Sequence, residues 1–436
     1  MDFTIHLPHE LVDRLFCYVS ARDISVCSQL CVAWREVTNR DAIWLNLCMR
    51  QGWLRYGLSS DILHEEPLFP DTSNVSGTSP VFHLPVPEGT RLSPVCKWKN
   101  IFLRVKHLNE NWAKGRYSSA QILRGHKEKV TAIECDGKYI VSGGADHKLI
   151  VWDLRERKPL YKVDVHSDTI SSLIIKGNLI VTGCSDSAVR VIDKNSGQML
   201  FSLLGHSGSV DHLALVNTCI VSAGTDKTVR VWSLSERKLK FIMKGHEDDI
   251  ECMHRHGNLL ATGSWDKTVR VWNVTTGKLL NLFNGHSEVV SCCQLGSEIL
   301  VSGSGDCDIR VWKVISGQCV HVLEGHTEEV YCTVFNGKVI ASGSSDSTVR
   351  IWTHSGESMH VLTGHLGVVR CLHINDERLV SGGDQKKIII WDYMKGIMLN
   401  IVHRHPTLLH LMWVSDTKLI TASPERPGTI TVLSYW

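Results

Sequence analysis

Histidine, serine or threonine, aspartate and tryptophan recur along the chain at fixed offsets. The first set is His126, Ser142, Asp146 and Trp152. A histidine held between a hydroxyl and a carboxylate activates the nucleophile of serine hydrolases. However, complete sets occur five times, and an enzyme has no use for five equivalent nucleophiles. We therefore interpret these residues as structural, linked by hydrogen bonds that satisfy a buried indole N–H.

The repeat that carries these sets predicts the architecture. Its histidines are separated by 40 residues, and once by 39, at His126, His166, His206, His246, His286, His326, His365 and His405. An apolar stretch follows each one and leads to Ser/Thr-Gly or a variant, then an Asp, then a Trp six residues later in the complete units. A period in the forties with Gly-His and a terminal Trp is typical of a WD-repeat propeller with four strands per blade. We therefore expect residues 117–436 to form an all-β propeller.

The number of blades depends on how this ring closes. The chain ends in an inner-type strand at 429–433, and an outer-type strand at 119–123 precedes the first repeat. If they pair, eight blades close the ring and no edge stays exposed. Seven blades with a displaced eighth repeat are the alternative, because that repeat has Arg404 in place of Gly, and Pro424 and Pro427 interrupt its turn. We predict eight blades.

Some repeats depart from the pattern, and a regular arginine series runs beside it. Ile192 replaces the Trp of repeat two, and Gln385 replaces the Asp of repeat seven. The blades of repeats two, seven and eight are therefore expected to be the least stable. The arginines two residues before the Trp position are Arg190, Arg230, Arg270, Arg310 and Arg350. We expect their methylene groups to pack against the blade and their guanidinium groups to be solvated, and we prefer this interpretation to a ring of anion-binding arginines.

The first 116 residues have a different character. Residues 1–57 are predicted to be helical, with Leu11, Leu15 and Val19 on one face of a first helix. Residues 58–95 hold six of the eleven prolines and are expected to be a linker. Residues 96–116 return to helical spacing and are predicted to form a connector.

The N-terminal segment carries the second informative pattern. Its residues include Leu7-Pro8-x-Glu10-Leu11, Asp23-Ile24, Leu30-Cys31-Val32-Ala33-Trp34 and Ile43-Trp44. This segment resembles an F-box, the three-helix module that docks substrate receptors onto the adaptor of SCF ubiquitin ligases. The resemblance, together with the repeats downstream, identifies the chain as similar to F-box/WD-repeat proteins. It implies adaptor binding by Leu7, Pro8, Glu10, Leu11, Ile24 and Leu30, and a cullin scaffold bound through that adaptor.

Three classes of function remain after this comparison. The favoured one is a substrate receptor that catalyses nothing itself and brings its substrate close to a ubiquitin-charged enzyme. The second is a propeller scaffold acting outside a ubiquitin ligase. An enzyme is the least supported, because no GxxxxGK[ST], HExxH or GxSxG motif occurs. We expect no cofactor and no metal, since the fifteen cysteines include no CxxC pair.

Composition limits the partners and the compartment. The formal charge of +2 is balanced, so it does not favour nucleic acid. The N-terminus lacks the pattern of a secretory signal, and no apolar run is long enough to span a bilayer. We therefore expect no membrane partner, reduced thiols and a cytoplasmic or nuclear location, or both.

The residues of one propeller face indicate the charge of the ligand. The resemblance implies that a phosphorylated degron would meet bases five residues after each repeat His and just before each turn Asp. Over these and neighbouring positions, Asp211, Asp249, Glu251, Glu329 and Asp384 oppose only Lys129 and Arg370. The sequence therefore predicts a basic or basic-aromatic peptide, bound by Asp211, Asp249, Glu251, Trp265, Tyr331 and Arg370. The alternative is that the acids are ordinary solvated surface and that the ligand lies around Arg370 and His410.

Overall fold

The computed structural model describes residues 7–57, 96–384, 387–403, 411–423 and 425–436. It contains two compact units, one of Met1–Asn111 with Trp436 and one of Trp112–Tyr435. Among the described residues, no helix combines the length and the hydrophobicity needed to cross a bilayer. Arg404, Gln385, His410, Pro424 and the predicted linker 58–95 lie outside the described residues.

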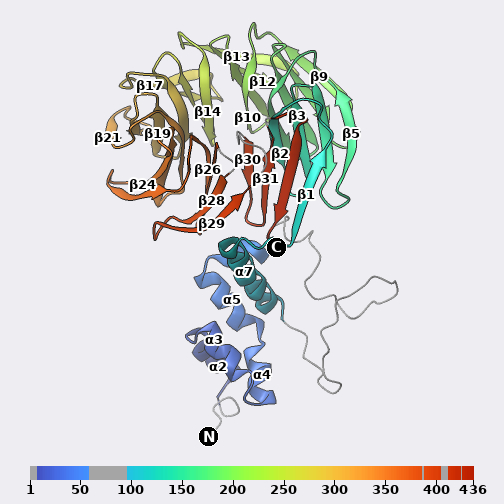
Figure 1. Cartoon of the computed structure of the whole chain (residues 1–436), viewed down its shortest axis with the longest axis vertical. Coiled ribbons are helices and arrows are strands. Elements are labelled where there is room, and N and C mark those ends of the chain that lie inside the picture. Colours follow the sequence, from blue (N-terminus) through green and yellow to red (C-terminus); the bar gives the residue numbers. More distant parts are fainter. Residues whose placement is uncertain (1–6, 58–95, 385–386, 404–410, 424) are drawn as a thin grey trace. The chain divides into compact units, whose positions relative to one another are not determined.

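The first unit is helical. Its elements are α2 (His9–Cys17), α3 (Ala21–Cys27), α4 (Val32–Thr38), α5 (Asp41–Arg50), the 3-10 helix η1 (Trp53–Gly57) and most of α7 (Lys97–Lys114) (Figure 1). Among the described residues 7–57, this segment has four short α-helices and one 3-10 helix. Pro8 precedes α2, where a missing N–H costs nothing, and the Ser20 side chain accepts a hydrogen bond from the Asp23 N–H at the start of α3.

The core of the helical unit forms around two aromatic residues. Trp44 is buried, and its indole N–H donates to the Thr38 carbonyl at 2.6 Å. Phe102 of α7 meets Trp44 edge-on, with ring centroids 5.2 Å apart. The buried residues of this core are Val12, Phe16, Ile24, Val37, Ile43, Trp44, Leu47, Cys48 and Phe102. The connector helix therefore supplies part of the module's core.

The second unit is a propeller of eight four-stranded antiparallel sheets arranged as blades around a centre (Figure 1). The first blade has β2 (Val130–Cys135), β3 (Tyr139–Gly144), β4 (Lys148–Asp153) and β5 (Lys158–Asp164), and the second has β6 (Ile170–Lys176), β7 (Leu179–Cys184), β8 (Ala188–Asp193) and β9 (Met199–Leu204). The third has β10 (Val210–Val216), β11 (Cys219–Gly224), β12 (Thr228–Ser233) and β13 (Lys238–Lys244). The fourth has β14 (Ile250–His256), β15 (Leu259–Ser264), β16 (Val269–Asn273) and β17 (Lys278–Phe283). The next three are β18 (Val290–Leu295), β19 (Ile299–Ser304), β20 (Ile309–Lys313) and β21 (Cys319–Leu323); β22 (Val330–Phe335), β23 (Val339–Ser344), β24 (Thr348–Thr353) and β25 (Ser358–Thr363); β26 (Val369–Ile374), β27 (Leu379–Gly383), β28 (Lys387–Asp392) and β29 (Ile397–His403).

The eighth sheet joins the two ends of the repeat array. Its order is β1 (Ser119–Arg124), β32 (Thr429–Ser434), β31 (Lys418–Ala422) and β30 (Leu411–Val414). Strand β1 pairs with β32 antiparallel, so that Ser119 lies opposite Ser434 and Arg124 opposite Thr429. The predicted closure and the predicted eight blades are thus confirmed. The degenerate last repeat keeps its place in the ring through strand pairing and the burial of apolar residues such as Ile420, Ile430 and Val432.

The end of the connector helix belongs to the propeller unit. The Trp112 indole stacks on Tyr435, with centroids 3.7 Å apart and planes 15° apart. Its N–H donates to the Asp416 carbonyl at 2.8 Å, and the Arg378 guanidinium lies 4.8 Å from its ring. Trp112 is almost fully buried. The last turn of α7 is therefore anchored by a large apolar side chain whose polar atom is satisfied.

Candidate functional site

The repeated His-Ser-Asp-Trp sets are structural hydrogen-bond networks. In the first, Nδ1 of His126 lies 2.9 Å from Asp146 and Nε2 lies 2.8 Å from Ser142 Oγ. The Trp152 indole N–H donates to the same Oγ at 2.9 Å. The residues of the other complete sets are His206, Ser222, Asp226, Trp232; His246, Thr262, Asp266, Trp272; His286, Ser302, Asp306, Trp312; His326, Ser342, Asp346, Trp352, with the same three bonds in each.

These networks cannot supply a hydrolytic nucleophile. Ser142 is fully buried and already accepts the Trp152 N–H, so no substrate carbonyl can reach its oxygen. Asp146 also accepts the Lys127 backbone N–H at 2.9 Å, which ties the loop before β2 to the turn after β3. The structure therefore confirms that these residues hold a loop and a buried indole in place.

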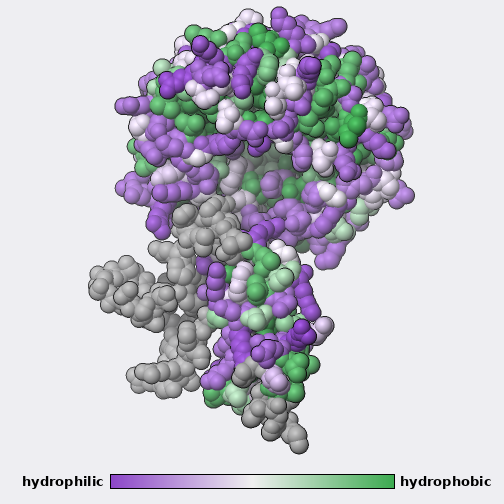
Figure 2. All heavy atoms as spheres, turned by 180° about the vertical axis from the view of Figure 1, so that it is seen from behind, coloured by the Kyte–Doolittle hydropathy of each residue, from purple (hydrophilic) through white to green (hydrophobic). Residues whose placement is uncertain are grey.

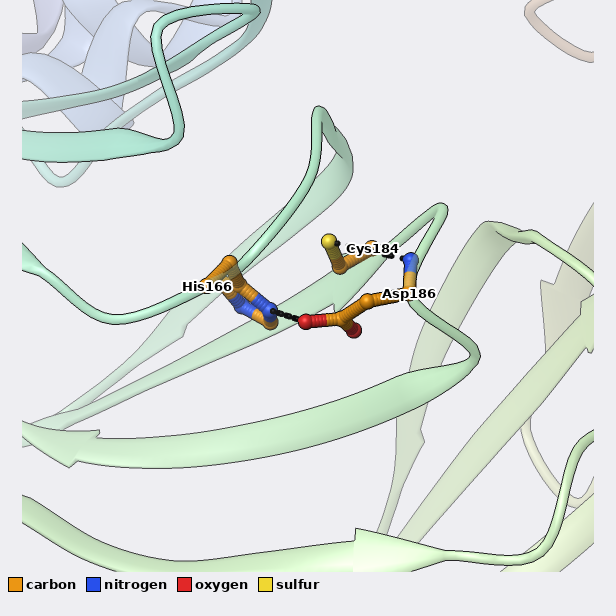
Figure 3. A group of neighbouring side chains, drawn as sticks. All are labelled: His166, Cys184 and Asp186. Atoms are coloured by element: carbon orange, nitrogen blue, oxygen red, sulfur yellow. Dashed lines mark hydrogen bonds and ion pairs between the residues drawn. The ribbon is translucent and has the colours of Figure 1, made fainter.

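Repeat two, which lacks the Trp, brings together a group with metal-ligand chemistry. His166, Cys184 and Asp186 place a nitrogen, a sulfur and an oxygen within 4.8 Å of one another (Figure 3). Arg190 Nη1 lies 2.7 Å from Asp186 Oδ2 and also contacts Nδ1 of His166. Burial raises the pKa of Cys184 to about 12, so its thiol stays protonated. An arginine bound to two of the three ligand atoms does not fit a divalent cation, and the group forms an ion-paired network instead.

Repeat two also differs from the other repeats in the residue before its histidine, which lies near the arginine in repeats three to six. In repeats three to six a glycine precedes the histidine, and the arginine head packs against it. A methyl group on Gly205 would lie 2.7 Å from Nη1 of Arg230, and one on Gly245 would lie 2.5 Å from Nη1 of Arg270. Repeat two has Val165 at this position. Arg190 lies 2.7 Å from Asp186, whereas the equivalent distance from Arg230 to Asp226 in the next repeat is 3.6 Å.

The first helix presents an apolar stripe to solvent. Leu11 and Leu15 were predicted to share one face, and the structure leaves each about half exposed, at 48% and 49%. The core uses the neighbouring face through Val12 and Phe16. The other large apolar side chains of this unit that are exposed include Tyr18, Val26, Leu30, Val32 and Met49. Figure 2 shows hydrophobic surface on the helical unit.

The residues predicted to bind the adaptor differ in how exposed they are. Leu11 and Leu30 are exposed, Pro8 and Glu10 are also exposed, and Leu7 packs partly against the core. Ile24 was predicted to touch the adaptor, but it is fully buried among Val12, Trp44 and their neighbours. This prediction for Ile24 is wrong for a direct contact, because α3 packs that face into the core. Tyr18 and Val32, which the sequence analysis did not single out, are also large apolar side chains that are exposed on this unit.

The predicted substrate residues of the propeller face fall into two groups. In the first, the Trp265 indole N–H donates to Glu251 Oε2 at 2.8 Å, and its backbone N–H donates to the Asp249 carbonyl at 3.0 Å. Asp211 accepts a hydrogen bond from Ser209 at 2.6 Å. His212, which the sequence did not single out, lies near Asp211 and Glu251. Burial lowers the pKa of His212, although both carboxylates act to raise it, so the ring is neutral at pH 7.

The second group surrounds Arg370. Its guanidinium lies 5.2 Å from the centre of the Tyr331 ring. Its Nε and Nη2 donate to the two carboxylate oxygens of Asp384 at 2.9 and 3.3 Å. Glu329, the remaining acid of this sector, accepts a hydrogen bond from Ser291 at 3.0 Å. The Arg370 charge is therefore paired with a bidentate carboxylate, which makes it a poor site for an anion. The alternative ligand position around Arg370 and His410 stays a prediction, because His410 lies outside the described residues.

Comparison with known families decides the affiliation of the chain. The WD40 family (WD domain, G-beta repeat) matches residues 117–153, 157–193, 197–233, 237–273, 277–313, 317–353 and 356–392, which together are more than half of the chain. The chain belongs to the WD40-repeat family. An F-box-like match covers residues 4–50, so the chain is an F-box/WD-repeat protein. The seven matched repeats are fewer than the eight blades because the degenerate last repeat is not matched.

Curated relatives of this F-box/WD-repeat chain are similar over part of their length. F-box/WD repeat-containing protein 7 of Drosophila melanogaster is 28% identical over 38% of this chain and 11% of its own length. The probable E3 ubiquitin ligase complex SCF subunit scon-2 of Neurospora crassa is 24% identical over 35% of this chain and 30% of its own. The probable SCF subunit sconB of Arthroderma benhamiae is 22% identical over 37% and 24%. The matches thus span between about a tenth and a third of these relatives.

Among solved structures, the F-box/WD-repeat chain is similar to the computationally designed Ika8 protein. The two are 30% identical with a TM-score of 0.67, over 72% of this chain and 98% of the designed one. The similarity supports the propeller fold.

Proposed function

We propose that this F-box/WD-repeat chain is the substrate-recognition subunit of an SCF-type ubiquitin ligase. The observation that carries the proposal is the pairing of an F-box-like module with a closed WD40 propeller in one chain. Relatives named as SCF subunits, scon-2 of Neurospora crassa among them, support it. The module would bind the adaptor and, through it, the cullin scaffold, while the propeller face binds the substrate.

The adaptor would cover the exposed apolar stripe of the helical module. Soluble proteins seldom leave several large apolar side chains exposed on so small a unit unless a partner covers them. Leu11, Leu15 and Leu30 are each about half exposed or more. Because these side chains are already partly buried, covering the rest of each would contribute about 1–2 kcal/mol. Pro8 and Glu10 are exposed too, so Pro8 would extend the apolar contact and Glu10 would form the polar edge of the same interface.

The chain itself would catalyse no reaction. Its repeated His-Ser-Asp sets are buried and serve the fold, and the His166 group is held by Arg190. A receptor accelerates ubiquitin transfer by proximity, because it raises the effective concentration of substrate lysines near the charged enzyme. We place this activity in the cytoplasm, the nucleus or both.

A pull-down with the purified adaptor tests this function. The intact chain should capture the adaptor, and the Leu7→Ala, Pro8→Ala double variant should capture it poorly while the propeller unfolds at an unchanged urea concentration. Trp34→Ala should act differently, since its ring packs on Phe16 with centroids 5.8 Å apart. It should destabilise the module by about 3 kcal/mol, as large-to-small core changes do. No capture by the intact chain would favour a scaffold acting outside a ligase, and undiminished capture by the double variant would show that Leu7 and Pro8 do not contact the adaptor.

A further inference from the structure

One aromatic side chain on the propeller face is unlike its counterparts. Trp265 lies in the turn between β15 and β16, and 51% of its surface is exposed. The residues at this position in the other described blades are Ala145, Ser185, Thr225, Gly305, Ser345 and Asp384. Exposing a large apolar ring to water costs free energy, and exposed aromatic residues are common at contact surfaces. The exposed ring therefore points to a ligand.

The indole is held in place by a carboxylate. Its N–H donates to Glu251 Oε2 at 2.8 Å, and Glu251 stands on the inner strand β14 of the same blade. This bond fixes the edge of the ring and puts a negative charge beside it. A cation that stacks on the ring would meet both the aromatic face and the carboxylate.

The carboxylates around this ring lack the cations that neighbouring acids have. Asp248 pairs with Lys227 at 3.5 Å, and Glu288 pairs with Lys267 at 3.4 Å. Within the described residues, no ion pair is formed by Asp211, Asp249 or Glu251. Nearby His212 does not compensate them, because burial keeps its ring neutral at pH 7. The side chains of Trp265, Glu251, Asp249 and Asp211, called the indole shelf below, thus carry uncompensated negative charge.

We propose that the indole shelf binds a lysine or arginine side chain of the substrate degron. This proposal rests on the receptor function above and names the chemistry of its ligand. A cationic head stacked on Trp265 gains a cation–π contact and an ion pair with Glu251 at once, while Asp249 and Asp211 attract it over about 10 Å. A phosphate, with a charge of about −2, is repelled by the same groups. Arg370, the base that would best suit a phosphate, is bound to Asp384.

Binding of the full-length chain to a library of immobilised peptides tests the proposed ligand of the indole shelf. Immobilised nonapeptides carry arginine, lysine, glutamine or phosphoserine at one position and mixed residues elsewhere. The chain should retain arginine and lysine peptides about tenfold over glutamine ones, and the preference should fall as salt rises. Trp265→Ala should remove most of it, Trp265→Phe should keep part, and Asp249→Lys with Glu251→Lys should abolish it.

The matched control is Glu298→Lys, an exposed acid in the turn between β18 and β19, at the opposite end of the strands from Trp265. It should leave the preference unchanged. The proposal is overturned if phosphoserine peptides are preferred, if arginine and glutamine peptides bind equally, or if the two lysine substitutions strengthen binding. Adaptor capture is measured on the same preparations. A chain that captures adaptor but shows no preference for basic peptides contradicts the indole shelf alone, whereas loss of capture contradicts the receptor function alone.

Discussion

At the scale of single residues, the sequence identified the hydrogen-bond networks, and it did so by repetition. One His-Ser-Asp set is compatible with catalysis, but five equivalent sets are compatible only with structure, and the observed geometry agrees. Residue positions that depend on neighbouring blades were harder to predict. The contact of Arg190 with both Asp186 and His166 could not be predicted from the spacing of residues along the chain.

Ser302 provides a residue-scale prediction about these networks. Its Oγ accepts the Trp312 indole N–H at 2.9 Å and bonds to Nε2 of His286 at 2.8 Å. Ser302→Ala leaves both buried groups without this partner, so the free energy of unfolding should fall by about 2 kcal/mol or more. Urea unfolding measures the change, with Ser316→Ala in an exposed turn as the control. Equal midpoints for the two variants would mean that the network contributes nothing to stability.

His365 gives stability a dependence on pH. Burial, with a smaller effect of Lys387, lowers its pKa to about 4. Between about pH 6.5, its ordinary value, and pH 4, the unfolded chain binds more protons than the folded one. Stability is therefore complete above about pH 6.5 and is lost as the pH falls towards 4. His365→Gln should remove about 2–3 kcal/mol of the loss between pH 7 and 4.5.

Urea unfolding at pH 7 and 4.5 measures this difference. His256→Gln, which changes an exposed histidine of β14, is the matched control and should lose as much stability as the unchanged chain. If acid destabilises the His365 variant as much as the unchanged chain, the buried neutral histidine is not a source of the acid sensitivity.

At the scale of elements, strand pairing was predictable because an unpaired edge is costly. The sequence shows an outer-type strand at 119–123 with no blade of its own and an inner-type strand at 429–433 with no outer neighbour, so we expected the two to pair. In the structure β1 pairs with β32 along its whole length. The helical module was predicted less completely. Periodicity showed an apolar face on α2 but not which face is buried, and the core uses Val12 and Phe16 while Leu11 and Leu15 stay exposed.

The closing strand has a consequence for solubility. Deleting residues 117–124 from the full chain should leave β32 unpaired along its outer edge, and such edges recruit other chains. The variant should elute from a sizing column as oligomers and scatter light on warming. An eight-residue deletion within 58–95 is the control and should stay monomeric. A closing-strand deletion that is monomeric and melts at an unchanged temperature would show that β1 does not seal the ring.

At the scale of the whole molecule, fold class and family were predictable because two independent patterns, the 40-residue repeat and the F-box signature, occur in one chain. The ligand was not predictable to the same depth. It depends on which side chains from different blades neutralise one another, as Arg370 and Asp384 do, and spacing along the chain does not reveal such pairs. The structure shows which charged side chains of the propeller face have no ion-pair partner among the described residues, and spacing along the chain could not show this.

The binding of purified adaptor tests the central claim, that the exposed stripe of α2 and its neighbours docks a ligase. Leu11→Asp with Leu30→Asp changes two leucines that are 48% and 64% exposed, so the module should stay folded. Leu204→Asp, at a 73% exposed leucine of the propeller, is the matched control. Calorimetry should show adaptor binding by the unchanged chain and the control, and at least a hundredfold loss, about 2.7 kcal/mol, for the double variant. Equal affinities for all three proteins, or no binding by the unchanged chain, would contradict the account.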